Sequence, residues 1–319
     1  MSTHLPFAPN TPWLAPLAGY SDLPFRLLCR EYGAACCTTE MISAKGLFYQ
    51  SPGTKRLLAT NELDQPLIVQ LFASEPSMLA WAVNTLCEQG FRYFDLNIGC
   101  SVPKVMRQHA GAAMLEDPDN ILACAKAMIA EAGRGHVGFK LRSSLASDTS
   151  LIPALPLALE DAGAGWITLH PRSAKQGFHG TANWDLLAKT VANLHIPVVA
   201  SGDLLTAQDG LRCLSQTKAA TLMYARGALA NPTIFRDHIL LSQGIEPTQQ
   251  TPLELKAMLF RHLHLVEQYG QGTNPVARMR GILSAYVRGL PFARNLRMEL
   301  CQAKTWDALP QILDHWICG

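Results

Sequence analysis

Short apolar runs recur along the first 225 residues of this chain, and stretches with helical periodicity separate most of them. The runs predict strands at Trp13–Pro16, Ala35–Thr39, Leu67–Leu71, Tyr93–Leu96, Val137–Leu141, Trp166–Leu169, Pro197–Ala200 and Ala220–Met223. Most of these runs are apolar at nearly every position, which is typical of parallel strands covered on both faces. Amphipathic stretches between them predict helices, including those at Glu75–Gln89, Asp119–Ala132, Leu151–Ala162 and Trp184–Leu194.

Eight strand–helix units over about 240 residues predict an α/β protein with a (β/α)₈ barrel. The alternative is a doubly wound sheet, which usually has fewer strands and a G-x-G-x-x-G turn after the first one. Here the first strand is followed by Leu17-Ala18-Gly19-Tyr20, which lacks that turn. The pattern therefore favours the barrel.

The pattern changes after Leu241. Residues 243–247 read as a linker, and the rest is helical, with helices predicted at Pro252–Tyr269, Pro275–Val287, Phe292–Cys301 and Lys304–Ile317. We therefore predict two domains: a barrel over residues 1–242 and a small all-helical domain over residues 243–319.

The barrel interpretation carries an internal test, because binding residues of such barrels gather at the C-terminal ends of the strands. Polar side chains do follow the predicted strands at this end. They are Glu40, Gln70, Asn97 with Cys100, Lys140 with Arg142, His170 with Arg172, Ser201 to Asp203, and Arg226. The sequence thus predicts a binding rim.

Two groups on this rim suggest chemistry. Gly99 lets the chain turn sharply before Cys100, so the thiol can project from a strand end, and Asn97 places an amide beside it. Small residues near Arg226 suit a phosphate group. Lys140 could stabilise an anionic reduced flavin or form a salt bridge with Asp203 or Glu40, and both readings stay open.

Charge is nearly balanced over the whole chain, at +2, but it is not evenly distributed. Residues 275–304 carry a single acid, Glu299, against six cations: Arg278, Arg280, Arg288, Arg294, Arg297 and Lys304. This bias indicates either a solvated helical face or a surface that follows a phosphate backbone.

Cysteine usage and hydropathy bear on the compartment. The nine cysteines form no C-x-x-C pair, which favours free thiols in a reducing environment over a disulfide framework or a zinc site, so no metal is expected. No apolar run approaches the roughly 18 residues of a membrane helix, and no signal peptide is evident. We expect a cytoplasmic protein without a membrane partner.

Several strings resemble tRNA-dihydrouridine synthases, and most closely their bacterial B-type branch. They occur in order, with matching spacing, from about Trp13 to Arg297. The strings are Ala15 to Arg26, Asp95 to Cys100 with Pro103 to Val105, Phe139 to Arg142, His170 to Arg172 with Gln176 to Trp184, Ser201 to Asp203, and Arg226 to Phe235.

The resemblance implies an FMN-bearing barrel with a helical tRNA-binding domain, which reduces uridine to 5,6-dihydrouridine at the expense of NADPH. FMN would contact residues at the strand ends, namely Pro16, Leu17, Ala18, Gln70, Lys140, His170, Ser201, Gly202, Asp203, Ala225 and Arg226. Cys100 would donate the proton, while Asn97 and Arg142 hold the uracil edge and Phe178 lies beside the pocket.

The same resemblance gives the basic helical stretch a partner. Arg278, Arg280, Arg288, Arg294 and Arg297 would hold the tRNA backbone while a D-loop uridine, extruded from its stack, enters the barrel. A cysteine thiol suits proton donation, because an ordinary thiol, with a pKa of about 8.5, is mostly protonated at neutral pH. We expect a monomer.

Three positions depart from the family pattern: Ser101 replaces a proline, Ser201 an asparagine and Ala225 a glycine. A positive φ at Ala225 would cost about 1 kcal/mol and weaken FMN binding. Two alternatives therefore stay open. One is a flavin barrel dehydrogenase acting on a free pyrimidine, and the other is a catalytically weakened flavin- or RNA-binding member of the same fold.

Overall fold

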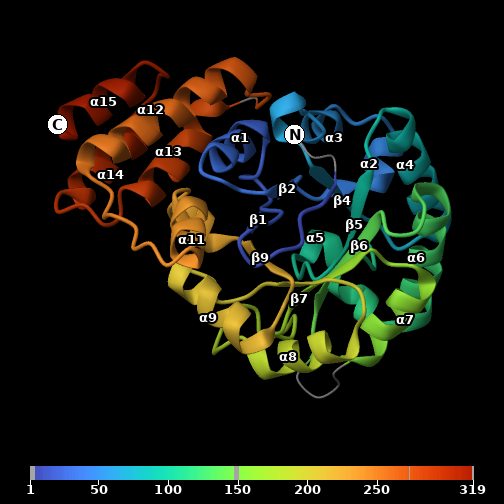
Figure 1. Ribbon diagram of the computed structural model, residues 1–319. Coiled ribbons are helices and arrows are strands. Elements are labelled where there is room, and N and C mark those ends of the chain that lie inside the picture. Colours follow the sequence, from blue (N-terminus) through green and yellow to red (C-terminus); the bar gives the residue numbers. More distant parts are fainter. Residues whose placement is uncertain (1–3, 147–150, 273, 318–319) are drawn as a thin grey trace.

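A computed structural model describes residues 4–146, 151–272 and 274–317 of the protein. Its centre is a closed barrel of eight parallel strands (Figure 1). They are β1 (Trp13–Leu14), β2 (Cys36–Thr38), β4 (Leu67–Phe72), β5 (Tyr93–Ile98), β6 (Val137–Arg142), β7 (Trp166–His170), β8 (Val198–Ala200) and β9 (Thr221–Tyr224). Strand β1 pairs with both β2 and β9, and β2 pairs with β4, which closes the ring. The predicted (β/α)₈ barrel is confirmed.

Helices surround the barrel (Figure 1). They are α1 (Leu23–Glu31), α4 (Pro76–Glu88), α6 (Pro118–Ala132), α7 (Ala154–Ala162), α8 (Trp184–Asn193), α9 (Ala207–Thr217), α10 (Arg226–Ala230) and α11 (Ile234–Ser242). Of these, α1 to α9 lie between successive strands, and α10 and α11 follow the last strand, β9. Capping residues mark where several of these helices begin. For example, Asp22 caps α1, and Thr206 with Asp209 forms a capping box on α9.

Short elements on the rim were not predicted. A two-residue strand, β3 (Ile42–Ser43), pairs with the end of β4, and two short helices follow it, α2 (Ala44–Phe48) and α3 (Pro52–Leu57). Another short helix, α5 (Pro103–Met106), follows the cysteine turn, and two 3₁₀ turns lie at Glu62–Asp64 and Gly111–Glu116. Elements of two to six residues are too short to show a hydrophobic period.

The N-terminal end of the barrel is filled by aromatic side chains. Trp13 and Trp166 are the first residues of β1 and β7, both are fully buried, and their ring centroids lie 6.2 Å apart. Phe7 packs 5.1 Å from Trp13, and Tyr93 lies 6.5 Å from Trp166. We call these four residues the aromatic floor. The functional rim lies at the opposite, C-terminal end.

Four helices follow the barrel: α12 (Pro252–Tyr269), α13 (Pro275–Tyr286), α14 (Ala293–Gln302) and α15 (Ala308–Trp316). They correspond to the four predicted helices. Helix α12 packs on α1 of the barrel, where the buried ring of His262 stacks on Phe25 and bonds the Tyr286 hydroxyl. Helix α11 ends at Ser242, so we keep the predicted domain boundary at residue 242 as a proposal.

Two further observations concern the described residues as a whole. None of their helices combines the length and the apolar character needed to cross a membrane. All eight cysteines among them are unpaired, as the sequence predicted for these positions.

Candidate functional site

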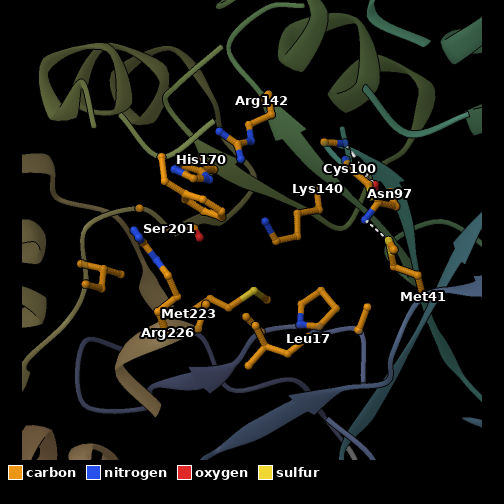
Figure 2. Close-up of a pocket in the computed structure, with 18 of the residues that line it drawn as sticks. Leu17, Met41, Asn97, Cys100, Lys140, Arg142, His170, Ser201, Met223 and Arg226 are labelled. Atoms are coloured by element: carbon orange, nitrogen blue, oxygen red, sulfur yellow. Dashed lines mark hydrogen bonds between the residues drawn. The ribbon is translucent and has the colours of Figure 1, made fainter. Parts of the chain in front are cut away.

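A pocket opens at the C-terminal end of the barrel (Figure 2). Apolar side chains, including Leu17 and Met223, form one wall, and polar or cationic ones form the other. Most residues that the sequence assigned to the site line this pocket: Pro16, Leu17, Ala18, Asn97, Cys100, Lys140, Arg142, His170, Phe178, Ser201, Gly202, Asp203, Ala225 and Arg226. Of the assigned barrel residues only Gln70 lies behind the lining.

The turn that carries Cys100 is fixed by Asn97. Strand β5 ends at Ile98, and the Asn97 Oδ1 atom accepts hydrogen bonds from the backbone N–H groups of Gly99 (3.2 Å) and Cys100 (2.9 Å). Cys100 is partly exposed, on the pocket wall. Cys100 therefore belongs to the pocket lining and not to the buried core.

The Asn97 amide is itself held by a chain of buried groups. Its Nδ2 donates to Gln70 Oε1 (2.8 Å) and to the Met41 sulfur (3.1 Å), and Gln70 Nε2 donates to Asp95 Oδ1 (2.8 Å). The Asp95 oxygen that accepts from Gln70 fixes which way the Gln70 amide points, and backbone N–H donors fix the Asn97 amide. The structure thus gives Asn97 a positioning task, and its contact with a uracil stays a prediction.

Lys140 extends from β6 into the middle of the pocket (Figure 2). Its ammonium makes no hydrogen bond or ion pair with any described residue. The alternative salt bridges are wrong, because Asp203 pairs with Arg172 and Glu40 accepts from the backbone of Gly19. Burial, and then the neighbouring Arg142, lower the pKa of Lys140, while burial raises the pKa of Asp95 behind it. An anionic ligand would offset this desolvation.

Arg172, which follows β7, holds together the chain segments at the ends of β7 and β8. Its guanidinium donates to Asp203 (2.6 Å), to the carbonyl oxygens of Gly180 (2.6 Å) and His179 (3.2 Å), and to His170 Nε2 (3.3 Å). Asp203 also accepts from the backbone N–H of Ala182 (2.7 Å). Arg172 thereby ties residues 179–182 to the loop after β8. We call this the Arg172 clamp.

His170 is neutral in this setting. Burial, followed by the charges of Arg142, Lys140, Arg172 and Arg226, lowers its pKa to about 2. Because an arginine can only donate, the Nε2 atom that faces Arg172 must accept, and the ring proton sits on Nδ1. His170 therefore acts as a hydrogen-bonding group and not as an acid.

Small residues and a cation meet beside this histidine. Gly202 has a φ of +106°, and a Cβ atom there would lie 2.6 Å from the His170 ring. Ala225 has a φ of −120°, so the condition for the expected cost, a left-handed alanine, is not met. The Arg226 guanidinium lies 4.3 Å from the centroid of the Phe178 ring, which stacks on His170.

A family model described as dihydrouridine synthase (Dus) matches residues 13–315. The chain belongs to the dihydrouridine synthase family. It is 33% identical over 287 residues to the probable tRNA-dihydrouridine synthase of Treponema pallidum, covering 87% of this chain and 84% of that one. It is 30% identical over 302 residues to tRNA-dihydrouridine synthase B of Pseudomonas aeruginosa, covering 94% and 90%.

Solved structures support the architecture. Morphinone reductase matches with a TM-score of 0.52 and 14% sequence identity, covering 80% of this chain and 94% of that one. At this identity the likeness shows the barrel fold alone. The family indicated by the sequence motifs is thus confirmed, together with its barrel.

The arginines of this dihydrouridine synthase's helical region fall into two groups. Arg278 Nη1 pairs with Asp22 (2.5 Å), its Nη2 donates to Tyr20 O (3.1 Å), and Arg280 donates to the Ala303 carbonyl oxygen. Exposed side chains without an ion pair to a described residue belong to Arg288, Arg294 and Arg297. Only this second group is free to meet a phosphate backbone without breaking an internal contact.

Sequence reasoning missed several members of the site, and three of them bear on its chemistry. Met41 and Met223 line the apolar part of the pocket, and buried Asp95 orients Gln70. Asp95 carried a usable signal, since an acid inside an otherwise apolar strand needs a partner. The methionines carried no such signal, because a methionine that lines a pocket and one that packs in a core look the same in sequence.

Proposed function

We propose that this protein reduces a uridine of tRNA, in its D-loop, to 5,6-dihydrouridine, with FMN as cofactor and NADPH as reductant. The observation that carries this proposal is the position of Cys100. Its thiol stands on a fixed turn at the wall of a pocket whose other walls hold Lys140, His170 and Arg226. The names of the relatives from Treponema pallidum and Pseudomonas aeruginosa support tRNA as the substrate.

The residues present fit FMN. Lys140 offers a half-buried ammonium that makes no hydrogen bond or ion pair with a described residue, which suits an anionic ring. Ser201, Gly202 and Ala225 leave room next to Arg226, which suits a phosphate. The apolar wall formed by Pro16, Leu17, Ala18 and Met223 suits a flat aromatic ring system. Neutral His170 adds a hydrogen-bonding group on the lining, while buried Gln70 stands behind it and holds Asn97.

Reduction of the C5=C6 bond of uracil requires a hydride on one carbon and a proton on its neighbour. Bound FMN, once reduced by NADPH, supplies the hydride. Cys100 then donates its thiol proton to the adjacent carbon, and the thiolate regains a proton from solvent. Asn97 keeps the thiol in place through the backbone N–H of Cys100. We assign the uracil edge to Arg142 and Phe178, which both line the pocket.

The test begins with cofactor content. The purified protein should be yellow, release FMN on denaturation, and lose its flavin absorbance when NADPH is added. It should then form dihydrouridine in tRNA transcripts made without modifications, as measured by mass spectrometry. A colourless protein that binds tRNA without flavin would indicate the catalytically weakened member.

A second assay separates the remaining alternative. The reduced protein is offered free uracil, free orotate and tRNA in parallel. We expect turnover with tRNA alone, because the three exposed, unpaired arginines of the helical domain would contribute nothing to the binding of a free base. Turnover with a free pyrimidine but not with tRNA would establish the dehydrogenase instead.

A further inference from the structure

Three aromatic side chains are exposed together on the barrel, away from the pocket lining. Phe48 and Tyr49, at the end of α2, expose 45% and 69% of their surface, and Trp81 on α4 exposes 36%. The Phe48 ring lies edge-on to both others, with centroids 5.2 Å from Tyr49 and 5.0 Å from Trp81. We call these three residues the aromatic patch. Contiguous exposed apolar surface of this kind usually marks a binding site.

The charges on the segment that carries Phe48 and Tyr49 are of one sign. Residues 41–61 contain three cations, Lys45, Lys55 and Arg56, and no acid. All three are exposed; Lys55 contacts Gln50, and neither Lys45 nor Arg56 forms an ion pair with a described residue. On α4 the acids nearest to Trp81 are Glu75 at the N-cap and Glu88 at the last position, roughly 9 Å and 10 Å away along the helix axis. The surface therefore suits a polyanion that also carries flat apolar groups.

The aromatic patch is connected to the pocket through a short piece of chain. Met41, which lines the pocket, is only seven residues before Phe48. Even fully extended, seven residues span at most about 25 Å. A nucleic acid with one base in the pocket could thus reach the aromatic patch with a neighbouring segment.

The aromatic patch is also connected to the helical domain. Helix α3 packs on α2. Its residues Gly53 and Arg56 line a small hollow together with Gln271 and Arg278, so both domains contribute to it. Figure 1 shows α3 at the top of the barrel, with α2 and α4 on one side of it and α12 on the other. This hollow, which Asp22 and Glu40 also line, joins the helical domain to α3 and so to the aromatic patch, with Arg56 as its cation without an ion pair to a described residue.

We propose that the aromatic patch is a second RNA contact of this protein, on which unpaired bases of the tRNA stack outside the catalytic pocket. Lys45 and Arg56 pair with the adjoining phosphates. Stacking on aromatic faces tolerates any base, and surrounding cations hold the backbone, which is the usual combination in proteins that bind single-stranded segments. The proposal rests on tRNA being the substrate.

The test measures the affinity of the full-length flavin-loaded protein for a tRNA transcript. Phe48→Leu with Tyr49→Leu, and Trp81→Leu, keep apolar bulk but remove the stacking faces. We expect Kd to rise about 5- to 100-fold in these variants. The slope of log Kd against log salt should stay unchanged, because no charge is removed. Lys45→Gln with Arg56→Gln should reduce that slope by about one to two.

Leu63→Ala is the matched control, since it removes an exposed apolar side chain (55% exposed) elsewhere on the barrel. It should bind tRNA like the parent. Parental tRNA affinity in both leucine variants would overturn the proposal and leave the aromatic patch to a protein partner. That result is distinct from a failure of the proposed function, which would show as absent dihydrouridine in the parent protein itself.

Discussion

The side-chain oxygen of Asn97 accepts a hydrogen bond from the backbone N–H of Cys100 at 2.9 Å, so the amide sets the geometry of the cysteine turn. The orientation of that amide depends in turn on Gln70 and finally on Asp95. An acid that touches neither the pocket nor the thiol therefore controls where the thiol points.

Asp95→Asn tests this chain of contacts. An asparagine can donate as well as accept, so Gln70 is free to turn over. Its amide nitrogen then faces Asn97 Nδ2, the hydrogen bond between the two amides is lost, and the Cys100 turn loosens. We expect uridine reduction to fall by about tenfold to a hundredfold, because small misplacements of reacting groups have effects of this size. The alkylation rate of Cys100 in the flavin-free protein should change as well. Asp161→Asn, an exposed acid on α7, is the control.

Cys100→Ala tests the proton donor. The variant should keep FMN and tRNA affinity within about twofold, while dihydrouridine formation falls about 10²- to 10⁴-fold, the usual contribution of a positioned acid. Cys301→Ala, which removes an exposed thiol on α14, should behave like the parent. Equal product formation by Cys100→Ala and the parent would contradict the assigned role.

The exposed arginines of the helical domain predict a change in salt dependence. Replacing Arg288, Arg294 and Arg297 with glutamine should weaken tRNA binding and reduce the slope of log Kd against log salt by roughly two to three, since each lost phosphate contact removes about 0.7–0.9. Arg212→Gln, an exposed arginine on the barrel, should leave it unchanged. An unaltered slope in the triple variant would mean that this face is only solvated.

Arg278 should behave differently from these three. Its ion pair with Asp22 is largely buried between the barrel and the helical domain. Arg278→Gln leaves a carboxylate without its partner, so we expect a loss of about 1–3 kcal/mol in the free energy of unfolding. Urea unfolding monitored by tryptophan fluorescence would measure it.

The Arg172 clamp predicts a loop effect. A lysine offers a single ammonium in place of a planar fork, so Arg172→Lys cannot hold Asp203, Gly180, His179 and His170 together. We expect faster hydrogen exchange over residues 173–182 and weaker FMN binding, by about tenfold if one charged hydrogen bond is lost. Exchange at parental rates in this loop would show that the clamp is dispensable.

Buried His262 predicts a pH dependence of stability. Burial, and then the charge of Arg278, lower its pKa to about 3, against about 6.5 in the unfolded chain. Below about pH 6.5 the unfolded state therefore binds a proton that the folded state does not. Stability is fully present above this pH and declines by about 1.4 kcal/mol per unit as the pH falls toward 3.

His262→Asn keeps an acceptor for the Tyr286 hydroxyl and removes the titration. Between about pH 7 and pH 5 its free energy of unfolding should decline less than that of the parent. His264→Asn, on the exposed side of the same helix, serves as the control. Parallel profiles for His262→Asn and the parent would exclude His262 as a source of the pH dependence.

The strands of the barrel could be predicted because each is a continuous apolar run, and polar residues mark where most of them end. For example, the predicted strand Val137–Leu141 differs from β6 by one residue. The short segment from Ile42 to Leu57 could not be predicted, since its elements are shaped by contacts with β4 and α4 and not by their own periodicity.

The candidate site likewise contains residues that could be predicted and contacts that could not. Residue types and strand ends were sufficient to place Cys100, Lys140 and Arg226 in one pocket. They could not show that Arg278 pairs with Asp22, because the two are far apart in sequence and meet only when α13 packs against the barrel. Nor could they show that Asn97 is occupied by Gln70, since an amide suits a ligand and a neighbouring side chain equally well.

The aromatic floor has a kinetic consequence. With Trp13, Trp166, Phe7 and Tyr93 filling the lower end of the barrel, molecules reach its interior by way of the rim. The dinucleotide that reduces the cofactor and the nucleotide that reoxidises it would then compete for the same opening of the pocket. The two substrates would then bind in turn, so that the two half-reactions alternate. An excess of either substrate should slow turnover.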